Sequence, residues 1–334
     1  MVARTRVLHL NYSSRRKSMK NSTKWENIFP AVCIPLNDDY SVNEAEFRKY
    51  LQWLVKFELI DGIVVNGHTG EITVFKPEER ALITRIAVEE VGDKVQIISG
   101  VSAEGTIETI EHAKAAQEAG ADGILLMPPH TWLRFGMKQE AVVRFFEDVA
   151  AAIDIGIIIH LYPAGTKAFY PVETILELAK IPKVKTLKMG TRDMAMYERD
   201  LRILRKKAPE LTILTCHDEI IVSTMYPYPG VDGALIGFGC CIPELITDAW
   251  RACKNNDFTL ARKYQDKIFS VSQAIYGIGE PSGDAHARMK EVLKQRGIFS
   301  SALMRLPILP LNQKELNGVV EGLKEAGVEP VGLV

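Results

Sequence analysis

Short apolar runs alternate with amphipathic stretches along the chain from residue 28 to residue 254. Eight of these runs are continuously apolar, which is typical of parallel strands covered on both faces. The predicted strands are 28–34, 62–65, 95–99, 123–127, 157–161, 184–188, 211–215 and 233–236. The stretches between them have helical spacing and predict helices at 42–58, 77–91, 106–119, 138–152, 171–180, 193–207, 218–224 and 242–254.

Local signals mark where several of these helices begin. Ser41 is followed three residues later by Glu44, a capping-box pattern for the first helix. Pro77 and Pro171 stand where helices should begin, and proline suits the first helical turn. Eight successive strand–helix units predict an α/β fold, the (β/α)8 or TIM barrel, over residues 28–255. A doubly wound parallel sheet is the alternative, but no predicted strand leads into a GxGxxG motif.

Two regions lie outside the predicted barrel. Residues 256–334 have only helical patterns, at 257–276, 284–296 and 313–326, and predict a C-terminal helical extension. Residues 1–27 are rich in arginine and lysine, with no acidic residue before Glu26. Such a segment is either a flexible tail or an organelle presequence, with Met19 as an alternative start, and we favour the tail.

The overall charge and the cysteines exclude several classes of protein. The formal net charge of the 334 residues is −1, so no overall field attracts nucleic acid or an anionic membrane. No apolar run reaches the roughly 18 residues that suggest a membrane span. The five cysteines are odd in number and include no CxxC pair, which predicts reduced thiols in the cytoplasm.

Lys188 stands at the end of the sixth predicted strand. A lysine in this place has its stem in the core and its amine at a pocket, where burial lowers its pKa because the ammonium loses solvation. The resulting free amine can form a Schiff base with a carbonyl substrate. The alternative is a lysine whose amine simply extends to water.

Other reactive side chains follow the second and fifth predicted strands, where a TIM barrel places its active site. The turn 67–70 contains two glycines around His68 and Thr69, so its backbone N–H groups can converge on a carboxylate, or it is only a tight turn. His160 and Tyr162 are two residues apart and point to the same side of the strand. The imidazole of His160 is a candidate proton shuttle, or a structural residue.

Histidines near four predicted strand ends also raise the hypothesis of a metal-dependent hydrolase. They are His68, His130, His160 and His217. No HxH pair occurs, and Asp218 beside His217 matches no known ligand spacing. We therefore predict no metal site.

With these residues in place, the chain resembles the dihydrodipicolinate synthase / N-acetylneuraminate lyase family of Schiff-base aldolases. The similarity covers roughly residues 28–300 and rests on the Gly-x-Thr-Gly-Glu loop at 67–71 and on Lys188, 28 positions after His160. The resemblance implies a TIM barrel with C-terminal helices, a homotetramer or dimer, and no cofactor beyond an imine on Lys188. It also implies that His68 and Thr69 hold the carboxylate of pyruvate or a related 2-oxo acid.

Several positions depart from the family pattern. The family has threonine or serine where His68 stands, and a proton-relaying tyrosine where His160 stands, so Tyr162 or His160 itself would relay protons. Gly165 replaces the arginine that holds the second substrate in the synthase, and no tyrosine lies near His130, where the family contributes one across the subunit interface.

The sequence therefore predicts a carbon–carbon or carbon–oxygen lyase that cleaves or dehydrates a 2-oxo-4-hydroxy acid or a deoxy sugar acid. Trp132 either forms an aromatic wall of its pocket or only packs against the barrel. Alternatives are dihydrodipicolinate synthase proper, which joins pyruvate to aspartate semialdehyde, a non-catalytic pyruvate sensor and a metal-dependent hydrolase. Lys188, His160 and Tyr162 would be catalytic, and His68, Thr69, Leu235 and His130 would bind the substrate.

Overall fold

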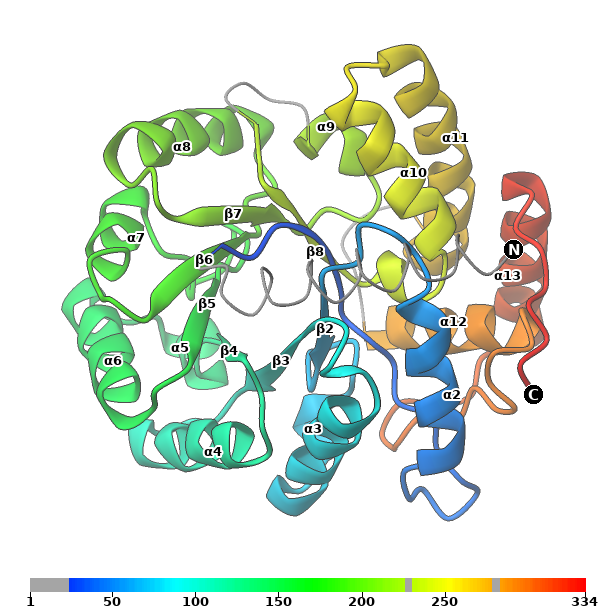
Figure 1. Cartoon of the computed structure of the whole chain (residues 1–334), viewed down its shortest axis with the longest axis horizontal. Coiled ribbons are helices and arrows are strands. Elements are labelled where there is room, and N and C mark those ends of the chain that lie inside the picture. Colours follow the sequence, from blue (N-terminus) through cyan, green and yellow to red (C-terminus); the bar gives the residue numbers. More distant parts are fainter. Residues whose placement is uncertain (1–23, 226–229, 278–282) are drawn as a thin grey trace, which may run out of the picture.

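Eight parallel strands form a nearly closed barrel in the computed structural model, which describes residues 24–225, 230–277 and 283–334 (Figure 1). The hydrogen-bonded order is β1-β8-β7-β6-β5-β4-β3-β2. A parallel bridge between Ala31 and Val64 links the two remaining edges, so the TIM-barrel prediction is confirmed. The strands are β1 (Asn27–Pro30), β2 (Gly62–Val65), β3 (Gln96–Val101), β4 (Gly123–Leu126), β5 (Gly156–His160), β6 (Val184–Met189), β7 (Thr212–Thr215) and β8 (Gly233–Ile236).

Helices surround the barrel and cover the outer face of its strands (Figure 1). Their apolar faces pack on the strands and form the larger of two hydrophobic clusters, which includes Phe47, Phe146 and Leu201. The surrounding helices are α2 (Glu44–Leu54), α3 (Pro77–Val91), α4 (Thr106–Glu118), α5 (His130–Phe135), α6 (Gln139–Ala152), α7 (Val172–Leu178), α8 (Met194–Lys207), α9 (Ile221–Met225) and α10 (Pro243–Lys254), with short 3-10 turns η1 (Ile72–Val74) and η2 (Phe238–Cys240).

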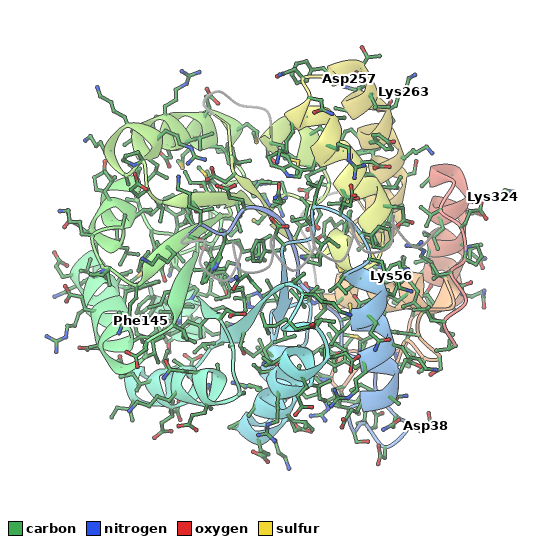
Figure 2. All side chains as sticks on the ribbon, viewed as in Figure 1. Asp38, Lys56, Phe145, Asp257, Lys263 and Lys324 are labelled. Carbon is green, nitrogen blue, oxygen red and sulfur yellow. The ribbon has the colours of Figure 1, made fainter. Side chains whose placement is uncertain are left out.

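The C-terminal region adds three helices beside α10 and α2, as predicted (Figure 1). They are α11 (Phe258–Ile275), α12 (Gly283–Gln295) and α13 (Gln313–Ala326). Figure 2 shows Lys263 and Lys324 pointing outward from α11 and α13, while Val271 and Val319 of the same helices are buried. This region therefore consists of amphipathic helices packed on the barrel. Helix α12 reaches the end of the barrel that is formed by the C-terminal ends of the strands.

The smaller hydrophobic cluster fills the interior of the barrel. Its lowest member is Trp25, which is only 7% exposed and lies at the N-terminal ends of β4 and β5. A Cβ atom placed on Gly123 or Gly156 would come within 2.2 or 2.7 Å of the indole, so both positions require glycine. Trp25 thus closes the bottom of the barrel, and the chain enters the fold before residue 28.

The structure corrects some details of the sequence prediction. The tail was expected to extend to residue 27, but Trp25 is buried and Asn27 begins β1, while residues 1–23 lie outside the described part of the chain. The cap of α2 is Asn43, which accepts a hydrogen bond from the Glu46 amide, whereas the Ser41 hydroxyl donates to Asp39. The short helix α5 was not predicted, because its sequence has no repeated apolar spacing.

Candidate functional site

A cavity of about 460 Å³ opens at the C-terminal ends of the strands, and Lys188 lies on its floor. Lys188 is the penultimate residue of β6, and its Cα pairs with that of His160 on β5 and that of Leu214 on β7. Part of its side chain remains accessible and lines the cavity. The strand therefore delivers the amine to the end of the barrel where TIM-barrel enzymes place their reactive groups.

The apolar interior beneath Lys188 explains the chemistry expected of its amine. Leu214 and Leu235 of the interior cluster are fully buried, and Leu235 also lines the cavity. Burial lowers the pKa of Lys188, because the ammonium loses water that these side chains do not replace. Asp218 and Cys216 oppose this shift in the pKa, since negative charge nearby favours the ammonium. The net shift is downward, which increases the fraction of nucleophilic free amine at neutral pH.

His68, His160 and Tyr162 form one cluster beside Lys188. The Tyr162 hydroxyl and His68 Nε2 are 3.0 Å apart, and the ring centroids of His160 lie 4.9 Å from Tyr162 and 5.4 Å from His68. Burial, followed by the nearby Lys188, lowers the pKa of His68 to about 3 and that of His160 well below its usual value. Burial also raises the pKa of Tyr162. At neutral pH the cluster therefore holds two uncharged imidazoles and a protonated phenol.

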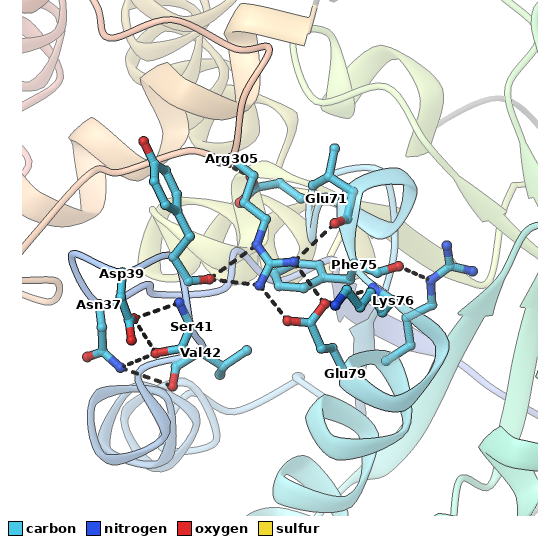
Figure 3. A network of polar contacts seen from close by, with 12 residues as sticks. Asn37, Asp39, Ser41, Val42, Glu71, Phe75, Lys76, Glu79 and Arg305 are labelled. Carbon is cyan, nitrogen blue, oxygen red and sulfur yellow. Dashed lines mark hydrogen bonds and ion pairs between the residues drawn. The ribbon is translucent and has the colours of Figure 1, made fainter.

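The loop after β2 is held in place from the C-terminal region. Glu71, which has a left-handed backbone (φ 55°), is ion-paired with the buried Lys290 of α12 at 2.5 Å, and its other oxygen accepts the Arg305 amide at 3.0 Å. The Arg305 guanidinium lies across the Phe75 ring and pairs with Glu79 (Figure 3). Thr69 is buried in this loop and lines the cavity. These contacts position the loop that was predicted to bind a carboxylate.

A second polar wall, formed by Asp218, Tyr276 and His286, lines the same cavity. Asp218, after β7, accepts the Phe238 amide at 2.6 Å and the Tyr276 hydroxyl at 2.8 Å. Tyr276 follows α11, and His286 lies on α12. From the sequence, Asp218 was a candidate only as a metal ligand, and Tyr276 and His286 were not predicted. Both belong to the helical region, where no strand end marks a reactive position.

Three other residues that the sequence singles out lie elsewhere. His217 is fully buried, and its ring packs against the ring of Tyr197 in the core. Trp132 packs against Phe145 and Tyr170 and does not line the cavity. His130 also lies outside the cavity lining, next to Glu104, with its ring centroid 6.2 Å from that of His68. A role for His130 in binding substrate remains a prediction.

Neither a metal site nor a membrane-spanning helix is found in the described part of the chain. Over residues 24–225, 230–277 and 283–334, no group of three or more histidine, cysteine, aspartate or glutamate side chains could hold a metal ion. Within the same ranges no helix is both long and apolar enough to cross a bilayer. The histidines near the strand ends are instead divided between the cavity, the core and α5.

Comparison with known proteins agrees with the fold. Residues 24–326 match the model of the Dihydrodipicolinate synthetase family. The 4-hydroxy-tetrahydrodipicolinate synthase of Coxiella burnetii is 26% identical over 299 residues, which cover 90% of this chain and 97% of that protein. Two solved structures share the fold: YagE, a prophage protein from E. coli K12 in complex with pyruvate (TM-score 0.83, 23% identity, 91% and 99% of the two chains), and dihydrodipicolinate synthase from Aquifex aeolicus (0.81, 22%, 92% and 99%).

The fold and the buried lysine define a TIM barrel of the aldolase-like class. The match over nearly the whole chain shows that this protein belongs to the dihydrodipicolinate synthase family. Members of this family are lyases or synthases that act on pyruvate through a lysine Schiff base.

Proposed function

We propose that this protein is a class I lyase that forms an imine between Lys188 and pyruvate or a related 2-oxo acid. Its substrate would be a 2-oxo-4-hydroxy acid or a deoxy sugar acid, which it cleaves or dehydrates. The observation that carries the proposal is the position of Lys188 on an apolar floor, facing neutral proton-transfer groups and the loop with Thr69.

In the proposed mechanism the free amine of Lys188 attacks the ketone carbonyl, and water leaves to give the imine. The 2-oxo acid carboxylate lies against the loop of His68 and Thr69. The protonated imine withdraws electrons, so the bond between C3 and C4 can break, or a proton can leave C3, to give an enamine. His160, next to Lys188 across β5 and β6, accepts or returns the proton, because its ring is uncharged at neutral pH.

Tyr162 has a supporting role in this proposal. Its hydroxyl is hydrogen-bonded to His68 Nε2, so it orients the ring of His68. Because burial raises its pKa, Tyr162 stays protonated, serves as a hydrogen-bond donor and does not act as a tyrosinate base. Replacing His160 with phenylalanine should therefore reduce turnover more than replacing Tyr162 with phenylalanine.

Borohydride reduction in the presence of pyruvate tests the imine directly. We expect an irreversible pyruvate adduct on Lys188, located by peptide mass spectrometry, and no adduct in Lys188→Ala. Lys185 of the same strand provides a matched control, because Lys185→Ala should leave the adduct unchanged. The absence of an adduct from the folded wild-type protein would exclude this function.

The synthase reaction itself is the alternative that the curated relative favours by name. Gly165 argues against it, because the resemblance places at this position the arginine that holds the second substrate of the synthase. A Cβ atom at Gly165 would meet no other atom within 4 Å, so packing does not require glycine here. A non-catalytic pyruvate sensor remains the other alternative, since His160 replaces the family tyrosine. Turnover of any 2-oxo-4-hydroxy acid that Lys188→Ala abolishes would exclude the sensor. Assembly as a homotetramer or dimer and a cytoplasmic location remain predictions.

A further inference from the structure

A second cavity, of about 730 Å³, lies at the end of the barrel opposite the cavity above Lys188. It is lined by the C-terminal ends of α7 and α8 and by the segments that lead into β6 and β7. Its volume is in the range that is typical of sites for small molecules. The proposed imine chemistry takes place at the other ends of the same strands, so this cavity has no part in it.

The lining combines aliphatic surface with an excess of positive charge. Eight of the fourteen lining residues are aliphatic or proline, among them Leu176, Ile181 and Leu211. The charged lining residues are Lys24, Lys180, Lys185, Lys207, Glu177 and Glu210. Four positive charges therefore face two negative charges, next to a surface that favours a hydrocarbon.

Other interactions account for three of the four lysines. Lys180 is ion-paired with Glu177 at 2.6 Å, and Lys24 already interacts with another group. Lys207 lies in the last turn of α8, where its charge offsets the partial negative charge of the helix end. Lys185 has no hydrogen-bond or ion-pair partner in the part of the chain that the structure describes. It is therefore the lysine that is available to a ligand.

An irregularity in β6 directs Lys185 to this cavity. The register of β5 and β6 shifts between Ile157 and Ile158, which leaves Lys185 as the extra residue of a β-bulge. A bulge interrupts the ladder of hydrogen bonds and turns a side chain away from its regular direction. The Lys185 stem passes beside Gly156 and Trp25, since its Cγ atom lies 3.4 Å from the place that a Cβ atom on Gly156 would take. The bulge and the glycine together hold the stem and place the amine at the cavity.

We propose that this cavity binds an aliphatic carboxylate. The carboxylate accepts a charge-assisted hydrogen bond from the Lys185 amine, and the hydrocarbon chain lies along Leu176, Ile181 and Leu211. Burial of the chain removes apolar surface of both ligand and protein from water. An alkylammonium is repelled by the excess of lysine, and a sugar acid leaves the aliphatic surface uncovered. The site thus differs in its chemistry from the polar cavity above Lys188.

Calorimetric titration of the full wild-type protein with four probes tests this proposal. The probes are octanoate, 1-octanol, octylammonium and butanoate. Octanoate should bind about tenfold more tightly than 1-octanol, which is the value of a hydrogen bond to a charged group. It should also bind at least about tenfold more tightly than butanoate, which has fewer CH₂ groups to bury. Octylammonium should not bind measurably.

Variants locate the ligand. Lys185→Gln should weaken the binding of octanoate by about tenfold and leave that of 1-octanol unchanged, because only the charge is lost. Ile181→Asn should weaken the binding of both, because it makes the aliphatic surface polar. Lys263→Gln, at an exposed lysine of α11, is the control for a general attraction of anions and should change neither (Figure 2). Octanoate should bind equally well to Lys188→Ala, because the upper cavity is not involved.

The proposal is wrong if octanoate and 1-octanol bind equally to the wild-type protein, or if Lys185→Gln leaves the affinity for octanoate unchanged. It is also wrong if Lys188→Ala abolishes binding, because the ligand then lies in the upper cavity. If no probe binds, the proposal is wrong as well, and a changed sedimentation of Ile181→Asn would then show that a second copy of the chain covers this surface. None of these results depends on whether pyruvate is trapped on Lys188, so this inference and the proposed function fail separately.

Discussion

The two ends of the barrel are built from the same eight strands but are closed by opposite kinds of contact. At the bottom, Trp25 packs on Gly123 and Gly156 and closes the apolar interior. At the top, the buried ion pair of Glu71 and Lys290 holds the loop beside a polar cavity. Lys188 lies at the top, between that cavity and Leu214 and Leu235 of the interior, and burial there lowers its pKa. The bottom therefore supports the fold, and the top supports the candidate site.

Breaking the ion pair of Glu71 and Lys290 should have the largest effect, because it should lower the free energy of unfolding and also loosen the loop that carries Thr69. In Lys290→Met the buried Glu71 would keep a charge without its partner, which costs about 3–5 kcal/mol of unfolding free energy. The loop with Thr69 would also lose its anchor, so KM for 2-oxo acids should rise. Urea unfolding and initial rates measure the two effects.

The double variant Glu71→Gln/Lys290→Met is the matched control for this prediction. It replaces the pair with uncharged side chains of similar size, and the glutamine oxygen can still accept the Arg305 amide. The double variant should be more stable than Lys290→Met alone. Equal stability of the two proteins would show that the unpaired charge is not the cause.

Removing the aromatic closure at the bottom should affect stability alone. Trp25→Ala would leave a cavity beneath the interior cluster and should lower the free energy of unfolding by about 3 kcal/mol or more. Pyruvate trapping on Lys188 should persist in the folded fraction. Phe135→Ala, at a side chain that is 74% exposed, is the control and should change stability by less than about 0.5 kcal/mol. Loss of trapping in folded Trp25→Ala would contradict the separation of the two ends.

A polar side chain between the two ends should shift the pH dependence of imine formation. Leu235→Asn would partly solvate the ammonium of Lys188 and raise its pKa, so the midpoint of borohydride trapping should move upward by on the order of one pH unit. Leu235→Met retains the apolar surface and should leave the midpoint unchanged. An unshifted midpoint in a folded Leu235→Asn protein would mean that desolvation from below does not control the amine.

The smallest expected effect, counted for one histidine and one pH unit, concerns the buried histidines His68, His217 and His286. Burial lowers the pKa of His68 and of His217 to about 3 and that of His286 to about 4, so the unfolded chain binds more protons than the folded one below about pH 6.5. Stability should therefore fall as the pH decreases from about 6.5 toward these values, by up to about 1.4 kcal/mol per pH unit for each histidine.

His217→Gln should remove one histidine's share of this slope in urea unfolding at pH 7, 6 and 5. Thr215→Val removes the hydroxyl that contacts His217 but leaves the ionisable ring, so it should retain the slope. Parallel slopes for wild type and His217→Gln would assign the acid sensitivity to other groups.

Much of this architecture was predictable because strands buried on both faces produce continuous apolar runs. The ranges 62–65 and 233–236 agree with β2 and β8 at both ends. Lys188, Thr69 and Leu235 line the cavity, and their roles there remain predictions. The predictions of helices and their caps failed where the apolar pattern was too short or where the outcome depended on the folding of a neighbouring turn. Helix α5 has six residues, and the choice of Asn43 over Ser41 as the cap depended on how the preceding turn folds.

The sequence alone determined the barrel, the end of it that is expected to carry the chemistry and the lysine expected to form the imine, because periodicity and strand ends are local properties. Only the tertiary structure decided which side chains meet there. Tyr276 and His286 reach the cavity from helices that follow the barrel, and Lys290 contacts Glu71 across more than 200 positions of the chain. Trp25 likewise packs against Gly123 and Gly156, which are distant from it in sequence. Such contacts depend on packing between elements far apart in sequence, so no local pattern encodes them.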